Sequence, residues 1–372
     1  MTASTAPCSV SIEISVAMNA YSAGATAPGA DARIEQISDW LSEQLRFPLV
    51  RLEPASNDAS FRRYFRAWRA DGATRVVMDA PPDKEPIEPF LRVAALLAGS
   101  GVHVPQVDAI DPRRGFILLE DLGSVLYLTR LRAGDDAEPL YADALQSLLQ
   151  MQVAVPGAAS LGAYDRPVLE REMALMPEWF CGRHLQLALG SEERAMLSQA
   201  FELLTVEALA QPQVFVHRDY HSRNLLLLEQ RNPGIVDFQD ALHGPVTYDL
   251  VSLLKDCYID WPRDTVTRWV GRYRARLAAA GGPAGAGDEQ FLRWFDFIGL
   301  QRHIKVLGIF ARLWWRDGKS GYLGDLPRTL HYVQDAAARY TELAPFAAWL
   351  EQRVAPLLPA ANARALRQAT PV

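Results

Sequence analysis

The spacing of apolar residues changes near the segment Glu120–Gly123, and this change most restricts how the chain can fold. Before it, short runs with a two-residue period lie among a few helical stretches, which is typical of a small β-rich unit. After it, apolar residues recur mostly at helical spacing. The order predicts an α+β fold with two lobes, a small β-rich N-lobe and a large helical C-lobe, and a ligand cleft between them.

The expected elements follow from these periods and from the turn residues between them. The first part is predicted to hold helices at Asp31–Leu45 and Glu85–Ala98 and strands at Leu49–Leu52, Phe61–Trp68, Arg75–Met78, Val104–Ile110 and Phe116–Leu119. The second part is predicted to hold helices at Tyr141–Gln152, Arg166–His184, Ser191–Leu209, Asp249–Tyr258, Asp264–Ala279, Glu289–Trp315 and Leu326–Leu343, with strand-like pieces at Val214–Val216, Leu225–Leu228 and Gly234–Val236. The predicted domains are a disordered extension at 1–30, the N-lobe at 31–122, the C-lobe at 123–358 and a tail at 359–372.

Composition excludes several classes of protein. The net charge of -6 argues against a nucleic-acid partner, and no apolar run is long enough to predict a membrane span. Residues 1–30 lack the basic and apolar regions of a signal peptide. Cys8, Cys181 and Cys257 lie too far apart in sequence to predict a disulfide framework or a zinc site. We therefore expect a cytoplasmic protein without an obligate protein partner.

The motif that carries chemistry lies between two predicted strands. Residues 217–224 read His-Arg-Asp-Tyr-His-Ser-Arg-Asn, the form H-x-D-x-x-x-x-N, and Asp237 follows Asn224 by thirteen residues. In phosphoryl transfer, a carboxylate such as Asp219 accepts the proton of the attacking hydroxyl. An amide and a second carboxylate, here Asn224 and Asp237, suit Mg²⁺ on the phosphates of ATP. The alternative is that both aspartates are turn or capping residues.

Three segments, residues 217–224, 235–240 and 244–250, resemble the aminoglycoside/choline kinase family of the protein-kinase-like fold. Segments 57–66, 77–82 and 301–310 are similar to one branch of that family, which phosphorylates amino sugars in bacterial cell-wall recycling. The resemblance covers roughly residues 33–355. It implies that Asp219 is the catalytic base, that Asn224 and Asp237 bind Mg²⁺, and that His221 stabilises the transferring group. It also implies that His217 braces the loop and that Asp249 fixes it through backbone N–H groups.

The nucleotide site is expected in the N-lobe and at the boundary between the lobes. The loop around Ser60 lies where kinases cover the phosphates, but it contains no glycine, so its backbone amides and the Ser60 hydroxyl are the expected donors. The strand Arg75–Met78 lacks the lysine that kinases place there, and Arg63, Arg66 or Arg75 is expected to replace it. Glu120 and Leu122 match the segment whose backbone pairs with adenine.

The acceptor is expected beside Asp219. Gln239 and Asp240 directly follow Asp237 and can bind sugar hydroxyls. Arg302, His303 and Lys305 can receive an acyl or carboxylate group, although a solvated helix face would also explain them. The resemblance implies that the acceptor is the anomeric C1 hydroxyl of N-acetylmuramate and N-acetylglucosamine. The alternatives are an aminoglycoside, choline or another small metabolite as acceptor, or a pseudokinase-like module that binds nucleotide without turnover.

Overall fold

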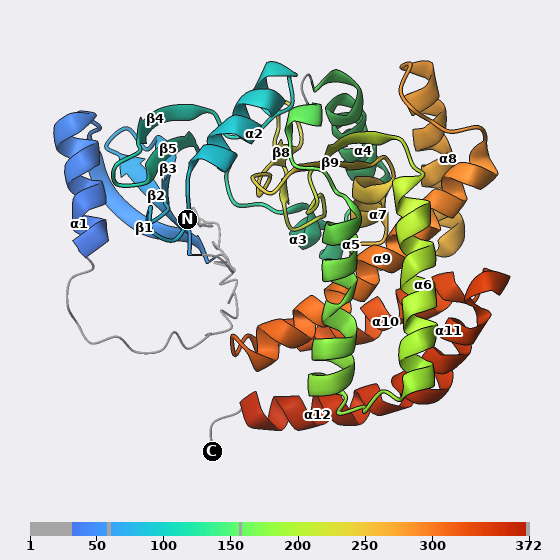
Figure 1. Cartoon of the computed structure of the whole chain (residues 1–372). Coiled ribbons are helices and arrows are strands. Elements are labelled where there is room, and N and C mark those ends of the chain that lie inside the picture. Colours follow the sequence, from blue (N-terminus) through green and yellow to red (C-terminus); the bar gives the residue numbers. More distant parts are fainter. Residues whose placement is uncertain (1–31, 58–60, 156–157, 370–372) are drawn as a thin grey trace, which may run out of the picture.

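The computed structural model describes residues 32–57, 61–155 and 158–369 (Figure 1). A β-sheet and helix α1 (Ala32–Asp39) lie at one end of the molecule, and most helices lie at the other (Figure 1). The predicted two-lobed α+β architecture is confirmed. The extension predicted at residues 1–30 and the expected phosphate contact at Ser60 lie outside the described residues.

The N-lobe contains one antiparallel sheet with the strand order β1-β2-β3-β5-β4. Its strands are β1 (Leu49–Asn57), β2 (Arg63–Arg69), β3 (Thr74–Asp79), β4 (Val107–Asp111) and β5 (Phe116–Glu120). The predicted hairpin between β2 and β3 turns at Gly72, whose φ of 83° suits a residue without Cβ. Every strand predicted in this half is present, with β1 longer than expected.

The two faces of this sheet have different partners because successive side chains of a strand point to opposite faces. Phe65, Val77 and Leu118 are buried on one face, under α1 and the π-helical turn Trp40–Gln44. The neighbouring positions on the same strands, Tyr64, Val76 and Leu119, line a cavity on the other face. The strand period thus separates the N-lobe core from its ligand-facing surface.

Helix α2 (Glu88–Gly99) joins the sheet to the C-lobe. Its Phe90 ring lies 4.9 Å from the ring of Phe238, centroid to centroid, and Phe238 directly follows Asp237. Both rings are buried in the large hydrophobic core. This contact places the loop that carries Asp237 against the N-lobe.

The C-lobe is mainly helical, as predicted, but its helices are more interrupted than the sequence suggests. The helix expected at Arg166–His184 is an α-helix followed by a π-helical segment, Met176–His184, in which Pro177 supplies no backbone N–H. The described part of the predicted tail, residues 359–369, lies in a helix (Figure 1). The α-helices are α3 (Tyr127–Arg132), α4 (Ala137–Ala154), α5 (Arg166–Met173), α6 (Ser191–Leu209), α7 (Tyr248–Leu254), α8 (Arg263–Ala279), α9 (Asp288–Trp315), α10 (Leu326–Ala337), α11 (Ala344–Trp349) and α12 (Leu358–Ala369).

Helix α9 is the central element of the C-lobe. It has 28 residues and is buried on all sides along its middle, from Trp294 to Gly308. The predicted core stripe of Phe291, Trp294, Phe295 and Ile298 is confirmed. Although α9 is long, no helix within the described ranges is both long and apolar enough to cross a membrane.

Two short antiparallel ribbons support the chemical motif. β6 (Gln213–Val216) pairs with β9 (Leu242–Pro245), and β7 (Leu225–Leu226) pairs with β8 (Gly234–Ile235). The first three of these strands in chain order match the prediction, whereas β9 was not predicted. The pairing brings loop 217–224 and loop 236–241 to the same end of the ribbons.

Substitution of Gly308 by alanine is expected to destabilise the protein. A Cβ at position 308 would lie 2.5 Å from the Cβ of Leu175 and 2.6 Å from its carbonyl oxygen. Helix α9 would therefore have to move away from the segment at Leu175, which lies between α5 and the π-helical segment. We expect Gly308→Ala to lower the free energy of unfolding by about 1–3 kcal/mol, measured by urea denaturation.

The matched control is Gly299→Ala in the same helix. There a Cβ would lie 3.5 Å from Val251, an ordinary contact, and alanine is the better helix former. Gly299→Ala is expected to leave the unfolding free energy unchanged or to raise it by up to ~1 kcal/mol. Equal effects of the two substitutions would show that the close approach at Gly308 does not limit packing.

Candidate active site

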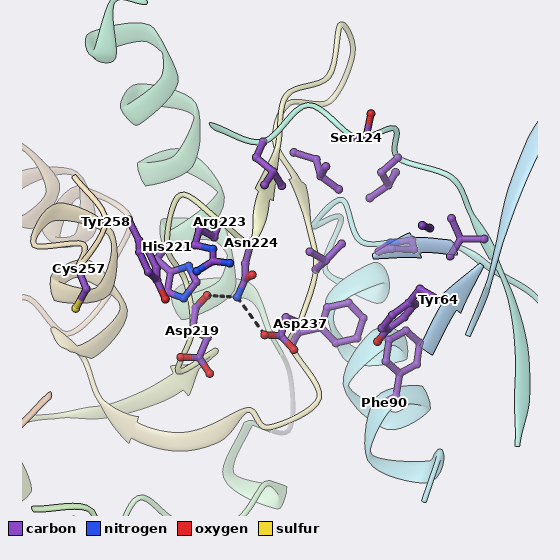
Figure 2. A pocket seen from close by; sticks show the side chains of 18 of the residues that line it. Tyr64, Phe90, Ser124, Asp219, His221, Arg223, Asn224, Asp237, Cys257 and Tyr258 are labelled. Carbon is purple, nitrogen blue, oxygen red and sulfur yellow. Dashed lines mark hydrogen bonds between the residues drawn. The ribbon is translucent and has the colours of Figure 1, made fainter. Parts of the chain in front are cut away.

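A cavity of about 580 Å³ lies between the lobes. Its N-lobe wall includes Tyr64 and Val76, its middle includes Asp219 and Asp237, and its C-lobe wall is formed largely by α9 and the segment after α7. The volume is typical of a pocket for a small molecule. Figure 2 shows Asp219, Asn224 and Asp237 together, with Tyr64 and Phe90 on one side of them and Cys257 and Tyr258 on the other.

The N-lobe end of the cavity is bounded by the segment Glu120–Gly123, which connects the two lobes. Glu120 and Leu122, the predicted nucleotide contacts, both line it. Arg66 also lines it and donates to Asp121 at 2.6 and 3.0 Å, with a third bond to the carbonyl of Gly123. This ion pair holds the segment between the lobes against β2.

The loop that carries Asp219 is anchored by Asp249. The Asp249 carboxylate accepts the backbone N–H of His217 at 2.6 Å and that of Arg218 at 3.0 Å. These bonds hold Arg218 in the left-handed region, at a φ of 77°, which a residue with a side chain adopts only when its surroundings fix it. The implied role of Asp249 as the anchor of the loop is confirmed.

A second anchor is the buried carboxylate of Glu172 on α5. It accepts Arg218 at 2.5 Å and lies 3.0 Å from the ammonium of Lys305. The hydroxyl of Tyr164 and the amide of Gln301 donate to the same carboxylate, Gln301 at 3.1 Å. Burial tends to raise the pKa of Glu172, but Lys305 and Arg218 lower it below its usual value, so the carboxylate is ionised.

Asp219 lies beside these cations and lines the cavity. Burial tends to raise its pKa, but nearby positive charges, first Lys305 and then Arg302 and Arg218, outweigh burial and hold the pKa below the usual value. Asp219 is therefore an ionised carboxylate at neutral pH. It can orient a hydroxyl and accept its proton.

Asn224 and Asp237 form a pair that fits one Mg²⁺ ion. The amide nitrogen of Asn224 donates to the Asp219 carbonyl at 2.9 Å and to Asp237 Oδ2 at 3.2 Å (Figure 2). Both amide protons are thus used, and the amide oxygen remains as an acceptor. Asp237 has a φ of 65°, an unusual conformation that directs it into the cavity. One amide and one carboxylate oxygen suit Mg²⁺, whose other ligands are commonly phosphate and water oxygens.

The two histidines of the motif have different surroundings. The Nδ1 atom of His221 is buried without a hydrogen-bond partner in the described part of the chain, and the ring lines the cavity. Burial lowers the pKa of His221, so its ring is neutral at pH 7. His217 is buried behind the loop: its Nε2–H donates to the Val236 carbonyl at 3.1 Å and its Nδ1 accepts the N–H of Asp219 at 3.3 Å. The expected bracing role of His217 is confirmed.

The C-lobe end of the cavity combines positive charge with aromatic rings. Arg302 and Lys305 line it, as predicted. The guanidinium of Arg223 lies over Tyr258, 4.7 Å from the ring centroid, and 5.7 Å from that of Tyr322. Aromatic faces at this end suit the apolar face of a sugar ring.

Other predicted site residues lie outside the cavity lining. Arg63 donates to the buried carboxylate of Asp79 at 2.6 and 2.9 Å. Of the three arginines considered as substitutes for the missing strand lysine, only Arg66 lines the cavity. The ring of His303 bonds to the Lys255 carbonyl at 2.9 Å, behind the cavity wall.

Gln239 and Asp240, which follow Phe238, are not part of the cavity lining. Gln239 is buried and donates to Asp237 Oδ1 at 2.7 Å, which orients the carboxylate. Asp240 is exposed. A role for either in binding the acceptor stays a prediction.

Sequence reasoning missed Glu172, Arg223 and Tyr258. Glu172 lies 46 residues before Arg218, so no local spacing connects them. A sequence signal existed for Arg223, since it lies inside the motif directly before Asn224. Tyr258 reaches the cavity only because α7 ends before it, and its ring packs edge-on to His221 at 5.4 Å.

The sequence matches the phosphotransferase enzyme family over residues 51–295. It is 49% identical to the N-acetylmuramate/N-acetylglucosamine kinase of Pseudomonas aeruginosa, in an alignment that covers 84% of this chain and 95% of the relative. It is 45% identical to the protein of the same name from Neisseria meningitidis, covering 86% of this chain and 95% of the relative.

The fold is similar to that of solved small-molecule kinases. Choline kinase LicA from Streptococcus pneumoniae superposes with a TM-score of 0.57 at 12% sequence identity, covering 83% of this chain and 100% of that chain. At this identity the similarity shows the fold alone, and that fold is kinase-like. The predicted protein-kinase-like architecture is therefore confirmed.

Neutral His217 predicts how stability depends on pH. Burial lowers its pKa from 6.5 to about 4, and protonated Nδ1 could not accept the Asp219 N–H. Between these two values the unfolded chain binds a proton that the folded chain does not, so stability falls as pH falls from 6.5 to about 4. His217 alone should lower the free energy of unfolding by about 3 kcal/mol over this pH range. Urea denaturation of the wild type and His217→Gln at several pH values measures it, and parallel pH profiles would contradict the assignment.

Proposed function

The chain belongs to the phosphotransferase enzyme family, and on this premise we propose that it is an ATP-dependent kinase for the anomeric C1 hydroxyl of N-acetylmuramate and N-acetylglucosamine. The products are the sugar 1-phosphates and ADP. This chemistry serves the recycling of peptidoglycan sugars. The similarity to kinases named for these two sugars, over most of both chains, supports this acceptor over an aminoglycoside or choline.

The observation that carries the proposal is the position of Asp219. It lies between the Asn224–Asp237 pair and the wall that includes Tyr258 (Figure 2). A nucleotide bound at the N-lobe end would have its terminal phosphate near the pair, and an acceptor at the C-lobe end would present a hydroxyl to Asp219. The arrangement supports transfer from one end of the cavity to the other.

The chain contributes positioning, a proton acceptor and a phosphate contact. Asp219 orients the sugar C1 hydroxyl and takes its proton as the new O–P bond forms and the bond to the ADP oxygen breaks. An anomeric hydroxyl is more acidic than an ordinary alcohol, so a carboxylate is a sufficient base. His221 contacts the transferring phosphoryl group through its ring N–H. The cationic side chains around Asp219 keep it ionised until transfer.

The nucleotide and the metal have separate contacts. Backbone groups of Glu120 and Leu122 pair with adenine. Asn224 and Asp237 hold Mg²⁺, which neutralises charge on the phosphates when it is bound. The Gln239 amide keeps Asp237 oriented toward the cavity.

The proposal is tested by measuring ATP consumption with N-acetylmuramate, N-acetylglucosamine, kanamycin and choline, with phosphorus NMR of the products. We expect turnover with the two sugars and a phosphorus signal coupled to the anomeric proton. Turnover with kanamycin or choline alone would refute the sugar assignment. Nucleotide binding without turnover on any acceptor would favour the pseudokinase alternative.

Asp219→Asn removes the proton acceptor and keeps its shape. We expect kcat to fall by about 10²–10⁴-fold while the Kd for ATP changes little. The control is Asp83→Asn, whose side chain is 74% exposed and lies in the N-lobe, and which should retain wild-type kcat. Retained turnover in Asp219→Asn would exclude Asp219 as the base.

Asp237→Asn weakens the metal pair. Because amide oxygens bind Mg²⁺ more weakly than carboxylates do, we expect the Mg²⁺ concentration for half-maximal activity to rise by roughly 10-fold or more, with kcat reduced. Titration of Mg²⁺ at fixed ATP measures this shift. An unchanged Mg²⁺ requirement would argue that Asp237 does not hold the ion.

A further inference from the structure

Arg302 is a buried cation at the C-lobe end of the cavity. Only 4% of the Arg302 surface is exposed to solvent. One terminal nitrogen donates to the hydroxyl of Ser252 at 2.7 Å, and the other lies 3.8 Å from the sulfur of Cys257. Its Nε is buried without a hydrogen-bond partner among the described residues. These neutral neighbours leave the guanidinium without a contacting carboxylate in the described ranges.

The other two basic residues of this segment already have protein partners. The ammonium of Lys305 lies 3.0 Å from Glu172 and 3.2 Å from the hydroxyl of Tyr248. The ring of His303 donates to a backbone carbonyl, and burial lowers its pKa well below 6.5, so it carries no charge at neutral pH. Arg302 is therefore the one of the three whose charge remains for a ligand.

The position of Arg302 indicates which ligand that is. Cys257, its neighbour, lies on the side of Asp219 opposite to Tyr64 and Phe90, which mark the nucleotide end (Figure 2). Phosphates would lie at the Asn224–Asp237 pair, between the two ends. A group that meets Arg302 is therefore part of the acceptor.

We propose that Arg302 is the specificity residue that binds the lactyl carboxylate of N-acetylmuramate. The inference rests on the proposed function. N-acetylmuramate differs from N-acetylglucosamine by a lactyl ether on O3, which carries the molecule's one carboxylate. A carboxylate at this site would accept from the unpartnered Nε–H and from a terminal nitrogen, the paired geometry that arginine favours.

The same geometry explains how one site accepts both sugars. N-acetylglucosamine leaves Arg302 with its two neutral protein contacts, and the space of the lactyl group is left to water. Both sugars place the C1 hydroxyl at Asp219. Arg302 therefore determines the preference between the sugars, while its effect on the pKa of Asp219 is the same for both.

The test compares kcat/KM for the two sugars in the wild type and in Arg302→Met, which removes the charge and keeps the length. Loss of the Arg302 charge near Asp219 should lower activity with both sugars to the same extent, so the ratio is the readout: we expect kcat/KM for N-acetylmuramate to fall about 10- to 100-fold more than that for N-acetylglucosamine. Arg302→Lys keeps the charge and should recover part of the preference. Equal losses with both sugars would overturn the proposal, because they would indicate a role in transfer or folding.

Arg293→Met is the matched control. It makes the same substitution on the same helix, at a residue that pairs with Glu207 and Glu342 outside the cavity. The ratio of kcat/KM values for the two sugars should equal that of the wild type. A changed ratio in this variant would mean that the ratio reports on helix α9 in general and would refute the assignment to Arg302.

A substrate variant tests the proposal without altering the protein. The methyl ester of N-acetylmuramate keeps the lactyl group and removes its charge, so the wild type should use it about 10-fold or more less well than the acid. Equal use of acid and ester would overturn the role of Arg302 even if Arg302→Met did not fold. Failure of the proposed function gives a different result, the absence of wild-type turnover with either sugar.

Discussion

The structure depends on one buried carboxylate, Glu172, and the cations around it. Arg218 and Lys305 come from the catalytic loop and from α9, and both contact this carboxylate. Removing either partner from such a network leaves an uncompensated charge, which is costly in a protein interior. The network thus fixes the loop relative to the central helix. It also brings positive charge to Asp219, which keeps this carboxylate ionised.

The same network explains why the two basic residues of α9 that line the cavity differ in their partners. Lys305 is paired with Glu172 and holds the pKa of Asp219 low, so its charge already has partners within the protein. Arg302 lies near it on α9 but, within the described ranges, donates only to a hydroxyl and a thiol. Two cations three residues apart therefore differ in their surroundings, since one has a carboxylate partner and the other has neutral contacts.

The cavity results from two independent periodicities. In the N-lobe, the strand period directs Tyr64 and Val76 toward the nucleotide end while their neighbours fill the core under α1. In the C-lobe, two short ribbons bring the loop of Asp219 beside the loop of Asp237. The contact between the tilted rings of Phe90 and Phe238 joins the two lobes.

Much of this arrangement could be predicted from the sequence. The strands of the N-lobe, the helical C-lobe and the family follow from local periods and from a motif whose residues lie close together in sequence. The predictions were less complete where the structure depends on pairing between residues that are distant in sequence. β9 has an irregular sequence and forms by pairing with β6 and, at His243, with Ala163. Arg63 turns to Asp79 because the sheet register places them opposite each other.

The sequence by itself determined the two lobes and the family, and it predicted Asp219, Asn224 and Asp237 as the reacting residues, because these depend on spacing along the chain. Only the tertiary structure decided which charges are neutralised and which remain for a ligand. His303 and Lys305 lie within three residues of Arg302, but each points in a different direction from helix α9. His303 therefore meets the carbonyl of Lys255, and Lys305 meets Glu172, which is distant in sequence. Burial and pairing are properties of the packed molecule, since they depend on residues brought together from α5, α7 and α9.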